Sequence, residues 1–155
     1  LQPSIAAAIC LLGSNCGSHT GYILDTLKFA ANNPGHQELL RSAAGGLAAL
    51  AIAGTADAAR ALFEHGIPSR DPERAAIALA IGHVALRNTA LLLQVLGKQP
   101  DLQAATELLR EAFDMLEEDF EEERFYVAVR RAYWAAPAGS AARKIAETVI
   151  QRLEF

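Results

Sequence analysis

Two cysteines and a histidine near the beginning of the chain are the residues whose types best suit metal chemistry. Cys10, Cys16 and His19 follow one another as C-x5-C-x2-H, and thiolate and imidazole are preferred ligands of zinc. The spacing is not that of a structural zinc finger, and the chain contains only these two cysteines. We therefore predict a buried Cys10, a Cys16 in a loop, and no bound metal or other cofactor. A zinc site and a disulfide are the alternatives.

The other histidines lack the spacings that common catalytic sites use. His36, His65 and His83 each fall near a predicted helix end or turn, and the helix dipole alone favours a histidine at a helix C-terminus. The sequence has no H-x-x-x-H pair, serine nucleophile elbow, Gly-x-Gly-x-x-Gly turn or phosphate-binding loop. We predict structural roles for these histidines and find no catalytic motif.

An acidic run precedes the most aromatic segment of the chain. Residues Glu117–Glu123 contain six carboxylates in seven positions. The acids are expected to form a solvated helix junction, because negative charge stabilises the start of the following helix. The alternative is a surface that attracts a cation or a basic partner.

Two stripes run along the aromatic segment at the helical spacing i, i+4, i+8. The first consists of Phe125, Val129 and Tyr133 and is predicted to lie in the core. The second consists of Tyr126, Arg130 and Trp134, which are residue types that dominate binding hot spots. We take this second stripe as a candidate partner-binding surface. The alternative is that it packs on the last helix with Arg130 reaching into solvent.

Composition and charge limit the class of protein. The chain has 155 residues, of which 52% are hydrophobic and 21% charged, as expected for one globular domain. Only 6% are aromatic, so the core must be built from Ala and Leu, and Ala44, Ala48 and Ala78 are predicted at close helix contacts. The net charge of −4 argues against a nucleic-acid partner. The uncharged run Ser42–Ala56 is shorter than the roughly 20 residues that span a bilayer, so we expect no membrane partner and a cytoplasmic location.

Start and stop signals predict about nine helices and no strands. The expected helices are Ser4–Leu12, Thr20–Asn32, Ser42–Ala53, Ala56–His65, Pro72–Ile81, Asn88–Gly97, Leu102–Glu117, Phe120–Ala135 and Ser140–Leu153. Thr55, Asp101 and Ser140 are predicted to cap the helices that follow them. Gly54 is predicted to end a helix in the left-handed backbone region.

Several of these helices form pairs in which an Ala-rich helix precedes a more polar or Leu-rich one. The Ala-rich segment Arg74–Gly82 and the Leu-rich segment Leu91–Leu96 resemble the HEAT-like repeat family, including its short bacterial form in bilin-lyase accessory proteins. In place of that family's Gly-Asp-Pro turn, the chain has Gly54-Thr55-Ala56 and Gly82-His83-Val84. The resemblance implies an all-α fold, an α-α superhelix of stacked antiparallel helical hairpins. Residues 1–155 would form one such domain; because the chain begins with Leu1, a fragment of a longer array is the alternative.

The resemblance also implies a non-enzymatic scaffold or adaptor that binds a partner protein or peptide. Repeat proteins bind along a preformed surface, and we expect a groove lined by the second helix of each pair. Asp57, Arg60 and Glu64, which recur on one polar helix face, are its candidate residues. A second copy of the chain is an alternative partner. The alternative function is an enzyme or a cofactor-handling accessory protein with a pocket between helices.

Overall fold

A computed structural model describes residues 20–33, 35–116 and 119–155, and all regular secondary structure in these ranges is α-helical. The eight helices are α2 (Thr20–Asn32), α3 (Gln37–Ile52), α4 (Ala56–Gly66), α5 (Glu73–Arg87), α6 (Thr89–Leu96), α7 (Leu102–Met115), α8 (Asp119–Ala135) and α9 (Ala141–Leu153). The all-α fold predicted from the sequence is therefore confirmed. The predicted helix Ser4–Leu12, the two cysteines and His19 lie outside the described residues.

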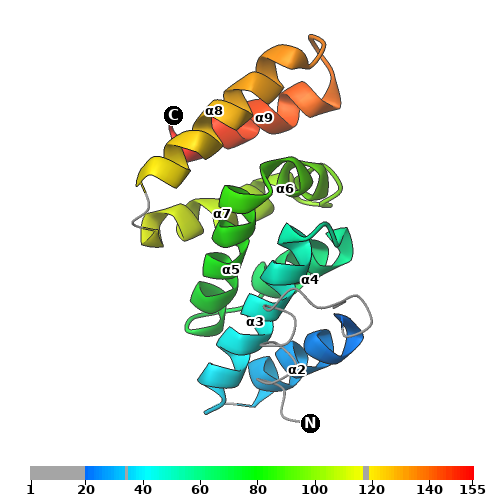
Figure 1. The fold of residues 1–155 in the computed structure, drawn as a ribbon, viewed down its shortest axis with the longest axis vertical. Coiled ribbons are helices and arrows are strands. Elements are labelled where there is room, and N and C mark those ends of the chain that lie inside the picture. The colour runs from blue at the N-terminus through cyan, green and yellow to red at the C-terminus, as the bar shows by residue number, and fades with distance from the viewer. Residues whose placement is uncertain (1–19, 34, 117–118) are drawn as a thin grey trace.

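The helices stack in two rows along the long axis of the molecule (Figure 1). One row consists of α3, α5, α7 and α9, each packed against the next, and the other consists of α4, α6 and α8. Helix α2 packs on α3 at one end of the stack, and the α8–α9 pair forms the other end. Helix α7 takes the third place in the first row.

The core is made mainly of Leu and Ala. Leu27, Leu47, Leu62, Leu92 and Leu108 come from five different helices, and each is 0% exposed. The alanines predicted at close contacts are also buried: Ala44, Ala48 and Ala78. Because small side chains let helix backbones approach, this composition favours a tight stack of helices over a layered α/β fold.

The end of helix α5 differs from the prediction. The turn expected at Gly82-His83-Val84 does not form, and α5 continues to Arg87. A Cβ atom on Gly82 would lie 3.1 Å from the Ala112 Cβ atom of α7. The glycine therefore permits close packing of α5 on α7, which offsets the roughly 0.5–1 kcal/mol that Gly costs in a helix. A mid-helix Gly and a turn Gly cannot be told apart by residue type alone.

Capping residues and a turn glycine mark the ends of several helices. The Asp101 and Ser140 side chains accept hydrogen bonds from the Ala104 and Arg143 backbone N–H groups at 3.0 and 3.2 Å, as predicted. Gly54 has a φ of 116°, also as predicted. Thr55 begins α4 but makes no side-chain capping bond, so this part of the prediction was wrong.

Asn88 joins two successive hairpins. Its side-chain oxygen accepts a hydrogen bond from the Leu91 backbone N–H, which caps α6. Its amide nitrogen donates to the backbone carbonyls of Ile52 at 3.1 Å and Ala51 at 3.4 Å, at the end of α3. One side chain therefore satisfies orphan groups at the ends of two helices.

Candidate functional site

An apolar groove of about 410 Å³ lies between α3 and α5. Its walls include Leu40 and Gly45 of α3, Ala76 and Leu79 of α5, and Met115 at the end of α7. Leu79 is 37% exposed and Met115, the only methionine, is 41% exposed. A side-chain atom added at Gly45 would meet nothing within 4 Å, so this part of the wall is open. Exposed apolar side chains around a hollow are typical of a contact surface.

The same face is hollowed again at the next two helix junctions. A smaller hollow of about 230 Å³ between α5 and α7 shares Ala75 and Met115 with the apolar groove. A third, of about 440 Å³, lies between α7 and α9 and shares Asp114 with the second. The face formed by α3, α5, α7 and α9 therefore changes from apolar at the α3 end to charged at the α9 end. We call it the odd-helix face.

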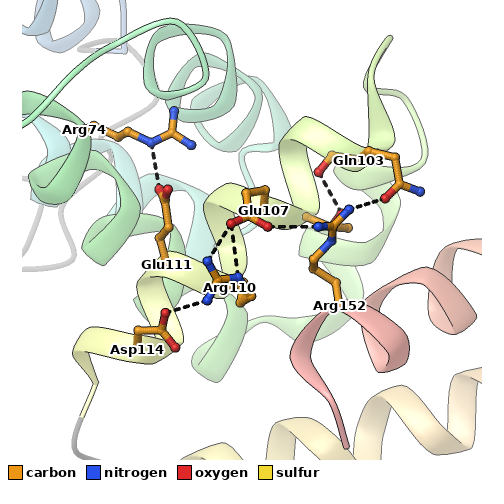
Figure 2. A network of polar contacts seen from close by, with 8 residues as sticks. Arg74, Gln103, Glu107, Arg110, Glu111, Asp114 and Arg152 are labelled. Carbon is orange, nitrogen blue, oxygen red and sulfur yellow. Dashed lines mark hydrogen bonds and ion pairs between the residues drawn. The ribbon is translucent and has the colours of Figure 1, made fainter.

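Arg74 holds three helices together beside the apolar groove. Its Nε atom donates to the Glu111 carboxylate of α7 at 2.7 Å (Figure 2). Its Nη1 atom donates to the backbone carbonyls of Gly66 and Ile67 at the end of α4, at 3.2 and 2.8 Å. The arginine thereby caps α4 and fixes α5 against α7, so the groove wall is held in one geometry.

A second group of charged side chains joins α7 to α9 (Figure 2). Arg110 contacts Glu107 at 2.6 Å and Asp114 at 2.8 Å along one face of α7. Arg152 of α9 donates to Glu107 at 3.1 Å and to the side-chain oxygen of Gln103. Hydrogen bonds from Arg110, supported by Arg152, hold the pKa of Glu107 below its usual value of 4.5. All these groups find partners within the chain, which indicates a structural role for the network.

His83 lies on the wall of the apolar groove. Arg87 Nη1 is 2.8 Å from His83 Nδ1, and because an arginine only donates, His83 accepts through Nδ1. Burial, followed by the charge of Arg87, lowers the pKa of His83, while Glu121 opposes the shift. His83 thus contributes a partly buried imidazole to the wall of the groove. In the described parts of the chain, no three His, Cys, Asp or Glu side chains are grouped to hold a metal ion.

The acidic run is partly neutralised where the structure describes it. Arg87 of α5 lies 3.5 Å from the carboxylate of Glu121, and Arg130 lies 4.0 Å from that of Glu123. Glu117 and Glu118 lie outside the described residues. The Glu121 contact joins α5 to α8, so at least one acid of the run is part of the helix packing.

The first aromatic stripe is buried for most of its length. Phe125 and Val129 are 1% and 0% exposed, which confirms their prediction as core residues, whereas Tyr133 is only partly buried. From the second stripe, Tyr126 packs against Phe155 with ring centroids 4.2 Å apart. Arg130 lies over the same ring at 5.4 Å. These two residues therefore pack on Phe155, which follows α9, whereas the alternative interpretation placed the second stripe on the last helix itself.

Trp134 separates from that group and lies at the end of α8. It is 74% exposed, and its ring meets that of Tyr133 edge to face at 5.1 Å. The Arg143 guanidinium of α9 lies 4.3 Å from the Tyr133 ring and 5.4 Å from the Trp134 ring. The sequence paired Trp134 with Arg130 because both lie on one helix. The true cationic neighbour comes from the next helix, and no local spacing could have revealed it.

The polar face of α4 carries the remaining predicted residues. Arg60 pairs with Asp57 at 2.9 Å and approaches Glu64 at 3.7 Å, and all three side chains are more than half exposed. They form an ion-pair group within one helix, whereas the odd-helix face is built by the other row. Their role in partner binding stays a prediction. Leu79 was missed because the Ala-rich α5 has no strongly polar side that would mark its exposed face. Met115 was missed because it meets the groove only through the packing of α7 on α5.

Comparisons with protein-family models, curated proteins and solved structures found no match to this chain. Among the described helices, none combines the length and apolar character needed to cross a membrane. The resemblance to HEAT-like repeats therefore stays a prediction.

Proposed function

We propose that this chain is a non-enzymatic scaffold that binds an apolar segment of a partner protein in the groove between α3 and α5. The observation that carries the proposal is the exposure of Leu79 and Met115 over a hollow of about 410 Å³. An amphipathic helix that buries its apolar face in such a groove is a common mode of peptide recognition. The partner would place apolar residues at i, i+3 or i+4, and i+7 against Leu79 and Met115.

Rigid walls favour this mode of binding. Arg74 fixes α5 to α4 and α7, and Asn88 fixes the end of α3 to the start of α6. A groove that keeps one geometry loses little conformational entropy on binding, which leaves more of the contact energy for affinity. The polar hollows nearer α9 would then select the charge of the residues that flank the apolar segment.

The test is a selection of peptides from a random amphipathic-helix library, followed by calorimetric titration of the selected peptides. Leu79→Asp should weaken their binding at least about tenfold, because it places a charge in the apolar contact. Phe29→Asp is the matched control, since Phe29 is 49% exposed but lies on α2. If no peptide is selected, or if both variants bind equally well, the proposal is wrong.

A further inference from the structure

The end of the stack formed by α8 and α9 has an unusual distribution of charge. Residues 124–146 contain five cationic side chains and no acidic one, although the whole chain has a net charge of −4. The five are Arg124, Arg130, Arg131, Arg143 and Lys144. The rest of the chain therefore carries a net charge of −9, because the whole is −4 and this stretch is +5. This cationic stretch covers the turn between α8 and α9 and the adjoining parts of both helices, whereas Glu121, Glu122, Glu123 and Glu147 of the same two helices lie outside it.

Two aromatic rings position one of these cations. The Tyr133 and Trp134 rings stand at 86° to each other, and the Arg143 guanidinium lies near both, at 4.3 and 5.4 Å. Stacking on ring faces holds a guanidinium by cation–π attraction while its N–H groups point outward along its edge. In the described parts of the chain, none of Arg124, Arg131, Arg143 and Lys144 forms an ion pair. Their donors are available to a ligand.

We infer that this α8–α9 surface, formed by Arg131, Tyr133, Trp134, Arg143 and Lys144, binds an acidic segment of a partner protein. Carboxylates of the partner would accept paired hydrogen bonds from the Arg143 guanidinium, which the Tyr133 and Trp134 rings already orient. An apolar side chain beside them would pack on Trp134, a residue type that frequently anchors interfaces. The surface lies at the opposite end of the stack from α2 and does not include the α3–α5 groove (Figure 1).

Charge favours a short acidic peptide over a nucleic acid. A nucleic-acid strand would meet the same cations, but it is a long polyanion that extends beyond them. The rest of the chain, with its net charge of −9, would repel that extension. A short peptide with a few carboxylates meets only the cationic end and gains from opposite charge there.

The experiment measures fluorescence anisotropy of a labelled synthetic peptide that contains several glutamates and two leucines. The wild-type chain should bind it, and binding should weaken as salt rises, because exposed charges are screened. A peptide with lysine in place of each glutamate should not bind. A labelled oligothymidylate long enough to extend beyond the cationic stretch is the nucleic-acid arm, and it should bind more weakly than the acidic peptide because the acidic rest of the chain repels the extension.

Four variants locate the binding surface. Arg143→Gln and Trp134→Ala should each weaken binding of the acidic peptide about tenfold or more. Arg143→Lys should bind more tightly than Arg143→Gln but more weakly than the wild type. Lysine keeps the positive charge but lacks the planar guanidinium that donates paired hydrogen bonds. The matched control is Arg70→Gln, which removes an exposed arginine from the connection between α4 and α5 and should leave binding unchanged.

Several outcomes would overturn the inference. They are no binding of the acidic peptide, equal binding by Arg143→Gln, and tighter binding of the oligothymidylate. Sedimentation velocity of the wild type and of Trp134→Ala tests for self-association. If the wild type self-associates and Trp134→Ala does not, a second copy of the chain covers this surface, and the inference of an acidic partner is wrong. Melting temperatures of both Arg143→Gln and Trp134→Ala should match the wild type, which separates lost binding from lost folding.

Discussion

Asn88 shows how one side chain joins two hairpins. It caps α6 through its oxygen and binds the end of α3 through its nitrogen. Asn88→Ala should lower the free energy of unfolding by about 1–2 kcal/mol, since both the cap and the link are lost. Asn88→Ser keeps a capping oxygen and should recover part of that loss. Urea denaturation measures both, and full recovery in Asn88→Ser would contradict a stabilising link to α3.

Two helical glycines, Gly66 at the last position of α4 and Gly45 in the middle of α3, should respond in opposite directions to an added methyl group. A Cβ atom on Gly66 would lie 2.7 Å from Leu108 and 2.8 Å from Ile77, both fully buried. Gly66→Ala should therefore lower the free energy of unfolding by about 1–3 kcal/mol. Gly45, where a Cβ would meet nothing within 4 Å, is the control: Gly45→Ala should raise it by about 0.5–1 kcal/mol through helix propensity. Equal responses at the two positions would show that the packing at Gly66 is looser than described.

At the scale of helices, the contact between α7 and α9 should depend on pH through Glu107. Hydrogen bonds from Arg110 lower the pKa of Glu107 in the folded chain. A carboxyl group with a lowered folded pKa contributes stability above its unfolded pKa and loses that contribution as the pH falls through the folded value. The difference in melting temperature between wild type and Glu107→Gln should therefore be present at neutral pH and shrink below pH 4.5. A difference that stays constant across this range would contradict the assignment.

The sequence was informative about helices wherever a capping residue or a proline marked an end. Predicted and observed bounds agree at Thr20–Asn32, and Asp101 and Ser140 cap as expected. The end of α5 was wrong because Gly82 resembles a terminator, and its close packing on α7 is a tertiary property. The sequence also did not indicate which side of α5 is exposed, because a helix of Ala, Ile and Leu has little amphipathic pattern.

At the scale of the whole molecule, the two proposed surfaces lie at different places along the stack. The α3–α5 groove is apolar, whereas the α8–α9 surface is cationic and aromatic. Neither surface could be predicted from residue spacing within one helix, because each combines side chains from different helices that the fold brings together. Arg143 of α9 lies near the ring of Trp134 of α8, and Met115 of α7 lines the same groove as Leu79 of α5.

The fluorescence of Trp134 reports on the α8–α9 end of the molecule, because Trp134 is the only tryptophan of the chain. Its 74% exposure predicts red-shifted emission that iodide quenches readily. Trp134→Ala should change the melting temperature little, since an exposed side chain loses few packing contacts. Blue, shielded emission in a chain shown to be monomeric would place Trp134 in the core and contradict the described end of α8.

The central claim is that a partner segment binds on the odd-helix face, in the groove between α3 and α5. The most direct measurement is a map of backbone amide chemical shifts during titration with a library-selected peptide. The account predicts that the largest changes cluster around Gly45, Leu79 and Met115, with α4 unaffected. Changes that cluster instead on Asp57 and Glu64 of α4 would contradict it and place the binding surface on the other row of helices.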